Sequence, residues 1–99
     1  DKENKLWREQ PFVFIDDDVD DEQLIQGIID LYIVEDNEIV VVDYKTDRVK
    51  KGKAGEEELI KRYKVQLDYY AKALEQLTGL RVKEKIIYSF GLGKAINIY

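Results

Sequence analysis

The chain has 99 residues, of which 16 are basic and 21 acidic, so its formal net charge at pH 7 is −5. It contains no cysteine and no histidine, which excludes a disulfide scaffold, a thiolate zinc site, an iron–sulfur cluster and any histidine-based catalytic site within these residues. The acidic balance argues against a module that coats DNA, and no apolar run approaches the length of a membrane span. Because the chain begins with Asp1 and has no methionine, we expect one small domain, residues 1–99, from a larger protein.

Three strands are predicted in the first half of the chain. Residues 11–15 are a short apolar run that ends at an acidic stretch. Residues 24–34 and 39–44 are rich in β-branched and aromatic side chains, and residues 35–38 between them have the composition of a turn. These two segments should therefore form a hairpin. The 39–44 segment is apolar on both faces, which predicts a central position in the sheet.

One long helix and two further strands are predicted in the second half. The helix begins with acidic residues 56–58 and ends near Thr78, before Gly79. Its apolar positions recur every three or four residues, which predicts one buried stripe: Leu59, Tyr63, Leu67, Tyr70, Leu74 and Leu77. Residues 82–90 and 95–99 are the predicted fourth and fifth strands.

The predicted order is β-β-β-α-β-β, which indicates an α/β fold with a mixed sheet and one long helix packed on one face. The third and fourth strands flank the helix, so we expect them to be parallel neighbours joined by a right-handed crossover.

Three polar features interrupt this apolar pattern. Asp30 lies in the middle of the second strand, where burial of a carboxylate is costly unless it has a partner. Asp43 and Lys45 alternate along the third strand and should point to the same face. Gln66 lies near the edge of the helical stripe, one turn before Tyr70. Taken singly, these features also fit an exposed strand edge, a same-face ion pair and a helix flank.

Taken together, the three features predict a metal-dependent phosphodiesterase. Two carboxylates from neighbouring strands, Asp30 and Asp43, suit Mg²⁺, which prefers oxygen ligands, and the backbone carbonyl of Tyr44 can serve as a third ligand. Lys45 then lies beside the attacking water and can orient it or help to remove its proton. Such a site activates water for attack on a phosphodiester.

Charged residues cluster in two runs, which are most simply explained as solvated loops. Residues 16–22 contain six acids in seven positions. Residues 45–53 contain five basic residues and one acid, and directly follow the predicted site. The basic side chains after Lys45 are therefore predicted phosphate contacts: Arg48, Lys50, Lys51 and Lys53.

Three motifs carry a resemblance to a known family. They are Gly27-Ile28-Ile29-Asp30, Asp43-Tyr44-Lys45 and Gln66-Leu67-Asp68-Tyr69-Tyr70, and they resemble the Gly-x-x-Asp, Asp-x-Lys and Gln-x-x-x-Tyr motifs of RecB-type nucleases in the PD-(D/E)xK superfamily. The resemblance implies a restriction-endonuclease-like fold and a Mg²⁺-dependent deoxyribonuclease in which Mn²⁺ can substitute. It also implies catalytic roles for the residues that match: Asp30, Asp43, Lys45, Gln66 and Tyr70. Of these, Gln66 and Tyr70 would position the DNA strand or Lys45.

The residues around these motifs resemble the C-terminal nuclease domain of the AddA family, the A subunits of bacterial ATP-dependent helicase/nucleases. This resemblance is carried by Arg8-Glu9-Gln10-Pro11-Phe12, Val42-Asp43-Tyr44-Lys45-Thr46-Asp47 and the segment from Tyr63 to Tyr70. It implies a cytoplasmic, nucleoid-associated exonuclease that acts on single-stranded DNA during double-strand break resection. ATP would bind only in a helicase part outside these residues, where an AddB-like subunit would be the partner.

Two departures from the family pattern qualify this interpretation. RecB-type nucleases usually carry a histidine on a helix before the first strand, and these residues contain none, so the upstream helix of the full domain is expected to be missing and the fragment alone can be inactive. The absence of cysteine favours the A subunit over the B subunit, whose nuclease domain holds an iron–sulfur cluster. A standalone exonuclease, a junction resolvase of the same fold, and a truncated fragment that only binds DNA or docks on a partner stay open as alternatives.

Overall fold

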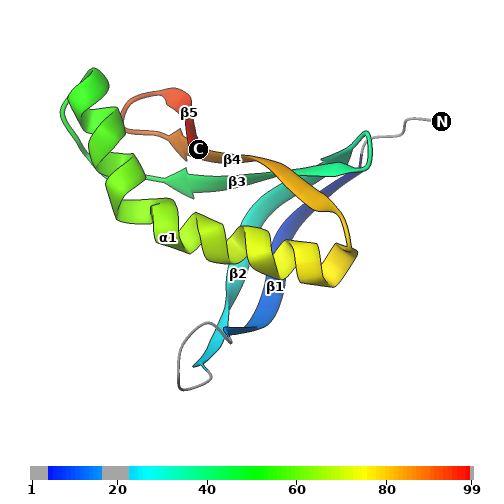
Figure 1. The fold of residues 1–99 in the computed structure, drawn as a ribbon. Coiled ribbons are helices and arrows are strands. Elements are labelled where there is room, and N and C mark those ends of the chain that lie inside the picture. The colour runs from blue at the N-terminus through cyan, green and yellow to red at the C-terminus, as the bar shows by residue number, and fades with distance from the viewer. Residues whose placement is uncertain (1–4, 17–22, 99) are drawn as a thin grey trace.

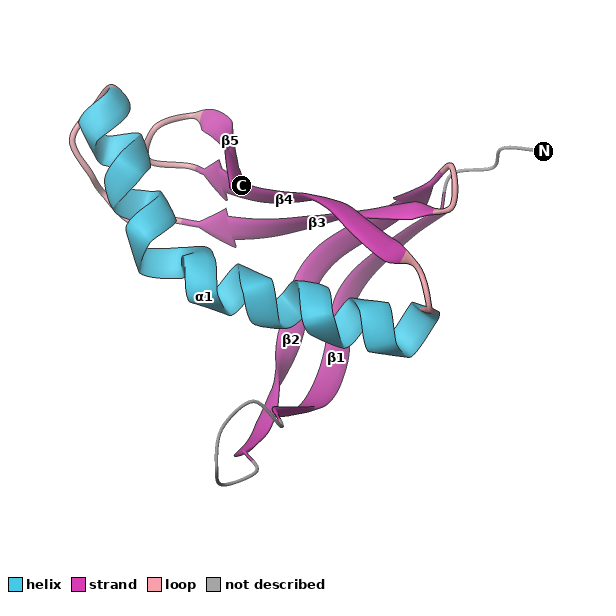
Figure 2. Cartoon of the chain, in the orientation of Figure 1, coloured by secondary structure: helices cyan, strands magenta, loops and turns pink. Residues whose placement is uncertain are grey.

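The computed structural model describes residues 5–16 and 23–98, and its five strands and one helix follow the predicted order (Figures 1 and 2). Their bounds are β1 Lys5–Asp16, β2 Gln23–Glu35, β3 Glu38–Lys45, α1 Lys53–Thr78, β4 Arg81–Ser89 and β5 Lys94–Ile98. The α/β prediction is confirmed. Tyr99, in the predicted fifth strand, lies outside the described residues.

The five strands form one mixed sheet in the order β1-β2-β3-β4-β5, so β3 is central as predicted. The hairpin of β2 and β3 is antiparallel, and its turn residues Asp36 and Asn37 have positive φ of 54° and 62°, as tight hairpin turns require. Strands β3 and β4 are parallel, which α1 makes possible by carrying the chain back across the sheet. The carboxyl ends of these two strands therefore lie together.

Strand β1 is longer than the predicted run of residues 11–15. It begins at Lys5, and its polar first half pairs with β2 as far as Val34. An edge strand needs only backbone pairing, so its first six residues are mostly polar and contain only two adjacent apolar side chains, Leu6 and Trp7. Asp16 belongs to β1, is buried and accepts a hydrogen bond of 2.8 Å from the Tyr69 hydroxyl, so the prediction of a solvated loop is wrong for this residue. The rest of that acidic run lies outside the described residues.

Helix α1 lies across one face of the sheet (Figure 1), and it ends at Gly79 as predicted. Gly79 has the left-handed φ of 74°, and its N–H donates to the Glu75 carbonyl. Most of the predicted stripe packs into the core: Leu59, Leu67, Tyr70 and Leu74 are buried and Tyr63 is half-buried. Leu77 is 59% exposed, so that part of the prediction is wrong. The periodicity predicts which way the Leu77 side chain points, but burial would also require a strand opposite the last turn of the helix.

The core forms between α1 and the inner face of the sheet, which is the face that α1 covers. Strand β3 contributes Ile39 and Val41, both fully buried, and β4 contributes Ile87. No helix in the described part of the chain is long and apolar enough to cross a membrane.

Candidate active site

The inner face of β3 changes from apolar to charged at its carboxyl end. Ile39 and Val41 fill the core, and Asp43, two residues further, is 3% exposed. Lys45 follows on the same face, with Nζ 2.9 Å from Oδ2 of Asp43. This geometry confirms that Asp43 and Lys45 share a face. The alternation of side chains that buries Ile39 and Val41 also places the Asp43 carboxylate on the buried face.

Asp30 on β2 reaches the same place. Its Oδ2 accepts a hydrogen bond of 2.9 Å from the backbone N–H of Tyr44, which lies between Asp43 and Lys45. Burial raises the pKa of Asp43 from its ordinary value of 3.8 to about 6; Lys45 acts to lower it, while the hydrogen bond and charge of Asp30 raise it further. The two carboxylates therefore lie together, and the lysine only partly offsets their repulsion.

The carboxylate oxygens of this site suit a divalent cation, because one of them, Oδ2 of Asp43, accepts no hydrogen bond from the described residues. Oδ2 of Asp43 is close to Lys45 Nζ, but the contact lacks the angles of a hydrogen bond, and no other described residue donates to this atom. A buried carboxylate oxygen in this state gains from a hard cation. No group of three acidic side chains gathers among residues 5–16 and 23–98, so Asp30 and Asp43 form a pair and not part of a larger acidic cluster there.

Helix α1 brings Tyr70 and Gln66 toward this site. The Tyr70 ring packs edge-on against Phe12, with centroids 5.3 Å apart. Burial, and then the charges of Asp43 and Asp30, raise the pKa of Tyr70 to about 12, so its hydroxyl stays protonated. One turn earlier, Oε1 of Gln66 is buried without a hydrogen-bond donor in the described part of the chain. Both side chains line a groove of about 320 Å³ between α1 and the β1–β2 hairpin.

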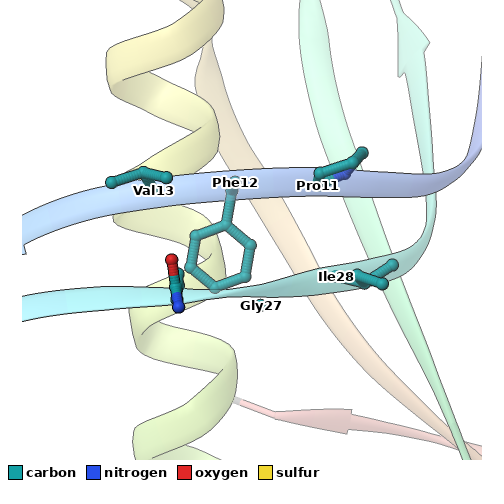
Figure 3. A pocket seen from close by; sticks show the side chains of 6 residues that line it. Pro11, Phe12, Val13, Gly27 and Ile28 are labelled. Carbon is teal, nitrogen blue, oxygen red and sulfur yellow. The ribbon is translucent and has the colours of Figure 1, made fainter.

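Gly27, the first residue of the Gly-x-x-Asp motif, makes room for this packing. A Cβ at Gly27 would lie 3.1 Å from the Phe12 ring, and Figure 3 shows that ring reaching from β1 across to Gly27 on β2. The missing side chain lets Phe12 lie close to the strand and contact Tyr70. The glycine therefore has a packing role that the sequence pattern alone did not reveal.

Tyr63 is a site residue that the sequence pattern placed only in the core stripe. Lys45 Nζ lies 4.1 Å from the centroid of the Tyr63 ring, which is a cation–π contact. The Tyr63 hydroxyl donates a 2.6 Å hydrogen bond to Asp47, which chiefly lowers the pKa of Asp47, and Arg62 also donates to Asp47 at 2.7 Å. Asp47 follows the Asp-x-Lys motif by two residues, but no local pattern indicated this contact with α1.

The four basic residues of the predicted DNA contact are all exposed. Arg48 and Lys51 line a pocket of about 510 Å³ with Thr46, Val49, Phe90 and Gly91. Lys50 and Lys53 are exposed and lie outside the lining of this pocket.

Comparison with known proteins places this geometry in a family context. The family model described as "PD-(D/E)XK nuclease superfamily" matches residues 2–96. A protein of Lachnoclostridium phytofermentans, named as the A subunit of an ATP-dependent helicase/nuclease, is 63% identical over 79 residues, which are 80% of this chain and 6% of that protein. Proteins of the same name from Clostridium novyi and Clostridium acetobutylicum are 55% and 38% identical, over 76% and 98% of this chain and 6% and 7% of their own length. The chain thus spans only a small part of these relatives.

Proposed function

The chain belongs to the PD-(D/E)XK nuclease superfamily, and from this premise we propose that it is the nuclease domain of an ATP-dependent helicase/nuclease. The substrate would be single-stranded DNA, and the reaction exonucleolytic hydrolysis of phosphodiesters during double-strand break resection and recombinational repair. The observation that carries this proposal is the buried Asp43, whose pKa of about 6 reflects burial and the neighbouring Asp30, with Lys45 2.9 Å away. A carboxylate pair of this kind costs stability in the absence of a bound cation, and such perturbed groups are concentrated at functional sites.

The residues that would hold a divalent cation are Asp30, Asp43 and the backbone carbonyl of Tyr44. Nucleases of this superfamily generally use divalent metal ions, and Mg²⁺ suits an all-oxygen set, with Mn²⁺ as a substitute. When bound, such a cation supplies positive charge at the scissile phosphate and makes the attacking water more acidic. The hydrogen bond from the Tyr44 N–H to Asp30 fixes one carboxylate relative to the strand that carries the other.

Lys45 is the proposed group that handles the attacking water. Its ammonium lies between the Asp43 carboxylate and the Tyr63 ring, so both its position and its orientation are restricted. From there the ammonium can orient the water by donating a hydrogen bond to it, and it would accept the proton of the water only as the neutral amine. The Tyr63 contact makes Tyr63 a positioning residue, because it touches Lys45 and not the phosphate in this proposal.

Gln66 and Tyr70 would bind the DNA strand beside the carboxylates. The Tyr70 hydroxyl, whose pKa is about 12, is a hydrogen-bond donor at neutral pH. The Gln66 side chain has an amide that can donate to phosphate, and its buried Oε1 can accept from an ordered water or from Lys45. These contacts support a strand that enters through the groove between α1 and the β1–β2 hairpin.

The helicase, its ATP site and a second, AddB-like subunit would belong to the rest of a longer polypeptide and its complex in the bacterial cytoplasm, near the nucleoid. The names of the relatives support this arrangement over a standalone exonuclease or a junction resolvase. An ATP-dependent cleavage assay separates the two, because only a helicase-linked nuclease depends on ATP for its supply of single strands.

The proposal is tested by Asp43→Asn in the complete polypeptide. We expect cleavage of labelled single-stranded DNA in Mg²⁺ to be lost while DNA-stimulated ATP hydrolysis stays at the parental level. Asp68→Asn is the matched control, because Asp68 is paired with Lys64 on α1 and Lys85 on β4 and is not one of the proposed ligands, so this variant should cleave DNA at the parental rate. Parental cleavage by Asp43→Asn would refute the catalytic assignment. Cleavage lost in both variants would instead indicate that the domain fails to fold.

A further inference from the structure

The outer face of the sheet, opposite α1, carries a cluster of aromatic rings directly behind the candidate site. Because side chains alternate along β3, Tyr44 points away from the face that holds Asp43 and Lys45. Tyr44 pairs with Tyr88 on β4, and Phe90 follows β4 by one residue. We call these three rings the outer aromatic cluster.

The three rings hold one another in place. Tyr88 and Phe90 meet edge to face with centroids 5.1 Å apart, and Tyr44 lies 5.8 Å from Phe90 and 6.4 Å from Tyr88. Yet Phe90 is 59% exposed and Tyr44 is 38% exposed. Large exposed rings that contact each other form a preordered apolar surface. The rings therefore lose little further side-chain entropy when a flat partner stacks on them.

Phe90 also joins this cluster to the basic residues that follow β3. It lines the 510 Å³ pocket together with Arg48 and Lys51. Gly91, which also lines this pocket, packs closely against the loop after β3: a Cβ there would lie 2.4 Å from the Asp47 carbonyl oxygen. The Phe90 N–H also donates to the Lys45 carbonyl at 2.9 Å. The rings and the basic side chains are therefore held side by side at the carboxyl ends of β3 and β4.

The local charge of this surface differs from that of the whole chain, whose net charge is −5. Arg48 and Lys51 are exposed beside the rings. The acid of the same loop, Asp47, is already bound by Arg62 and Tyr63 on α1, which turns its charge toward the helix. Exposed rings next to two cations that form no ion pair among residues 5–16 and 23–98 are complementary to a polyanion with flat apolar groups.

We propose that the outer aromatic cluster is a stacking surface for the bases of single-stranded nucleic acid, with Arg48 and Lys51 on the phosphates. The proposal rests on the proposed function, because it gives the strand a path around the end of β3 to Asp43. Aromatic side chains bind single strands without sequence preference, since every base has a π-face. A duplex fits poorly, because its bases stack on each other and it presents phosphates outward.

The test measures DNA affinity of the complete polypeptide in EDTA, with a fluorescent single-stranded oligonucleotide and a duplex of the same sequence. Phe90→Leu and Tyr88→Leu keep apolar bulk and remove the ring. We expect each to weaken single-strand binding by about tenfold and to leave duplex binding unchanged, as loss of one stacked base predicts. Arg48→Ala and Lys51→Ala should weaken both ligands, and each should reduce the slope of log affinity against log salt by about one.

Trp7→Leu is the matched control, because Trp7 is a partly exposed ring on the far edge strand β1, stacked on Tyr32. It should bind both DNAs like the parent. Parental single-strand affinity in Phe90→Leu and Tyr88→Leu would overturn the proposal. So would a lowered melting temperature with unchanged affinity, which would show that another part of the polypeptide covers the rings. Because Asp43→Asn tests cleavage separately, loss of the stacking surface alone would leave the nuclease proposal standing.

Discussion

Asp43 and Asp68 both form ion pairs with lysine, but the two carboxylates differ in burial and in the charges around them. Asp43 is buried on the inner face of β3, beside Asp30, and it forms an ion pair with Lys45. Asp68 lies on α1, with a side chain that is 37% exposed and bound by both Lys64 and Lys85. Burial acts to raise the pKa of Asp68, but the two lysines bring it below the ordinary value, whereas the pKa of Asp43 is raised to about 6.

The ion pairs of Asp68 stabilise the fold, whereas the buried Asp43 and its neighbour Asp30 destabilise it. Asp68 has more positive than negative charge around it, so its ion pairs are locally favourable. Asp43 is desolvated and shares its surroundings with another carboxylate, which leaves a deficit of positive charge. A lysine contact by itself therefore identifies nothing; the combination of burial and a second acid is what marks Asp43 as a functional candidate.

The largest expected difference between the two pairs is in cleavage. Lys45→Ala, measured in the complete polypeptide, should lower DNA hydrolysis by about 100-fold to 10,000-fold, because the group that handles the attacking water is lost. Lys85→Ala removes the equivalent partner of Asp68 and should cleave at the parental rate. Lys45→Arg should not restore activity, because a guanidinium keeps its proton. Near-parental cleavage by Lys45→Ala would leave Lys45 as a structural partner of Asp43.

Stability against pH should differ in sign between the two aspartates. For Asp43, the shift from 3.8 to about 6 corresponds to about 3 kcal/mol. Because its folded pKa is raised, the free energy of unfolding should fall as pH rises from about 4 to about 6 in metal-free solution. Asp43→Asn should therefore be more stable than the parent at about pH 8, by up to about 3 kcal/mol, and equally stable at about pH 4.

The Asp68→Asn variant tests the opposite sign of the pH dependence of stability. The pKa of Asp68 is lowered in the fold, so its contribution is present above the ordinary value and is lost in acid. Its exposed pairs are worth less than about 1 kcal/mol, and the variant should be slightly destabilised at neutral pH. Urea denaturation across this pH range measures both variants. A parental stability that does not fall between about pH 4 and about pH 6 would contradict the environment assigned to Asp43.

Divalent cations should distinguish the two pairs next. Millimolar Mg²⁺ or Mn²⁺ should raise the melting temperature of the parent, because a ligand that binds only the folded state stabilises it. Calorimetry should show that tight Mn²⁺ binding is lost in Asp30→Ala and in Asp43→Ala, each of which removes a proposed carboxylate ligand, and is unchanged in Asp68→Ala. Equal Mn²⁺ affinity in all three variants and the parent would show that the cation site is misassigned.

The smallest effect concerns how Lys45 is held. Tyr63→Phe keeps the ring over Lys45 and removes the hydrogen bond to Asp47, so it should cost about 1 kcal/mol of stability and little activity. Tyr63→Leu also removes the cation–π contact and should lower kcat by several-fold more than the Phe variant, with KM nearly unchanged. Steady-state kinetics on single-stranded DNA measure the split. Equal kcat in the two variants would show that the ring does not position Lys45.

Local sequence patterns were enough to predict the order of strands and helix and the face of β3 on which the Asp-x-Lys motif lies. Alternation along 39–44 and the three-to-four spacing of the helix are local consequences of backbone geometry, so the central β3, the shared face of Asp43 and Lys45 and the helix end at Gly79 could be predicted.

The solvent exposure and the charged neighbours of each side chain, in contrast, follow from how the helix and the sheet pack together. The buried Asp16, the exposed Leu77, the Tyr63 contact with Lys45 and the outer aromatic cluster each depend on which distant segment lies opposite. The same holds for the raised pKa of Asp43, since burial by the packed sheet and helix outweighs the adjacent lysine. Local periodicity gives a side chain its direction, but desolvation and stacking depend on neighbours that are remote in sequence.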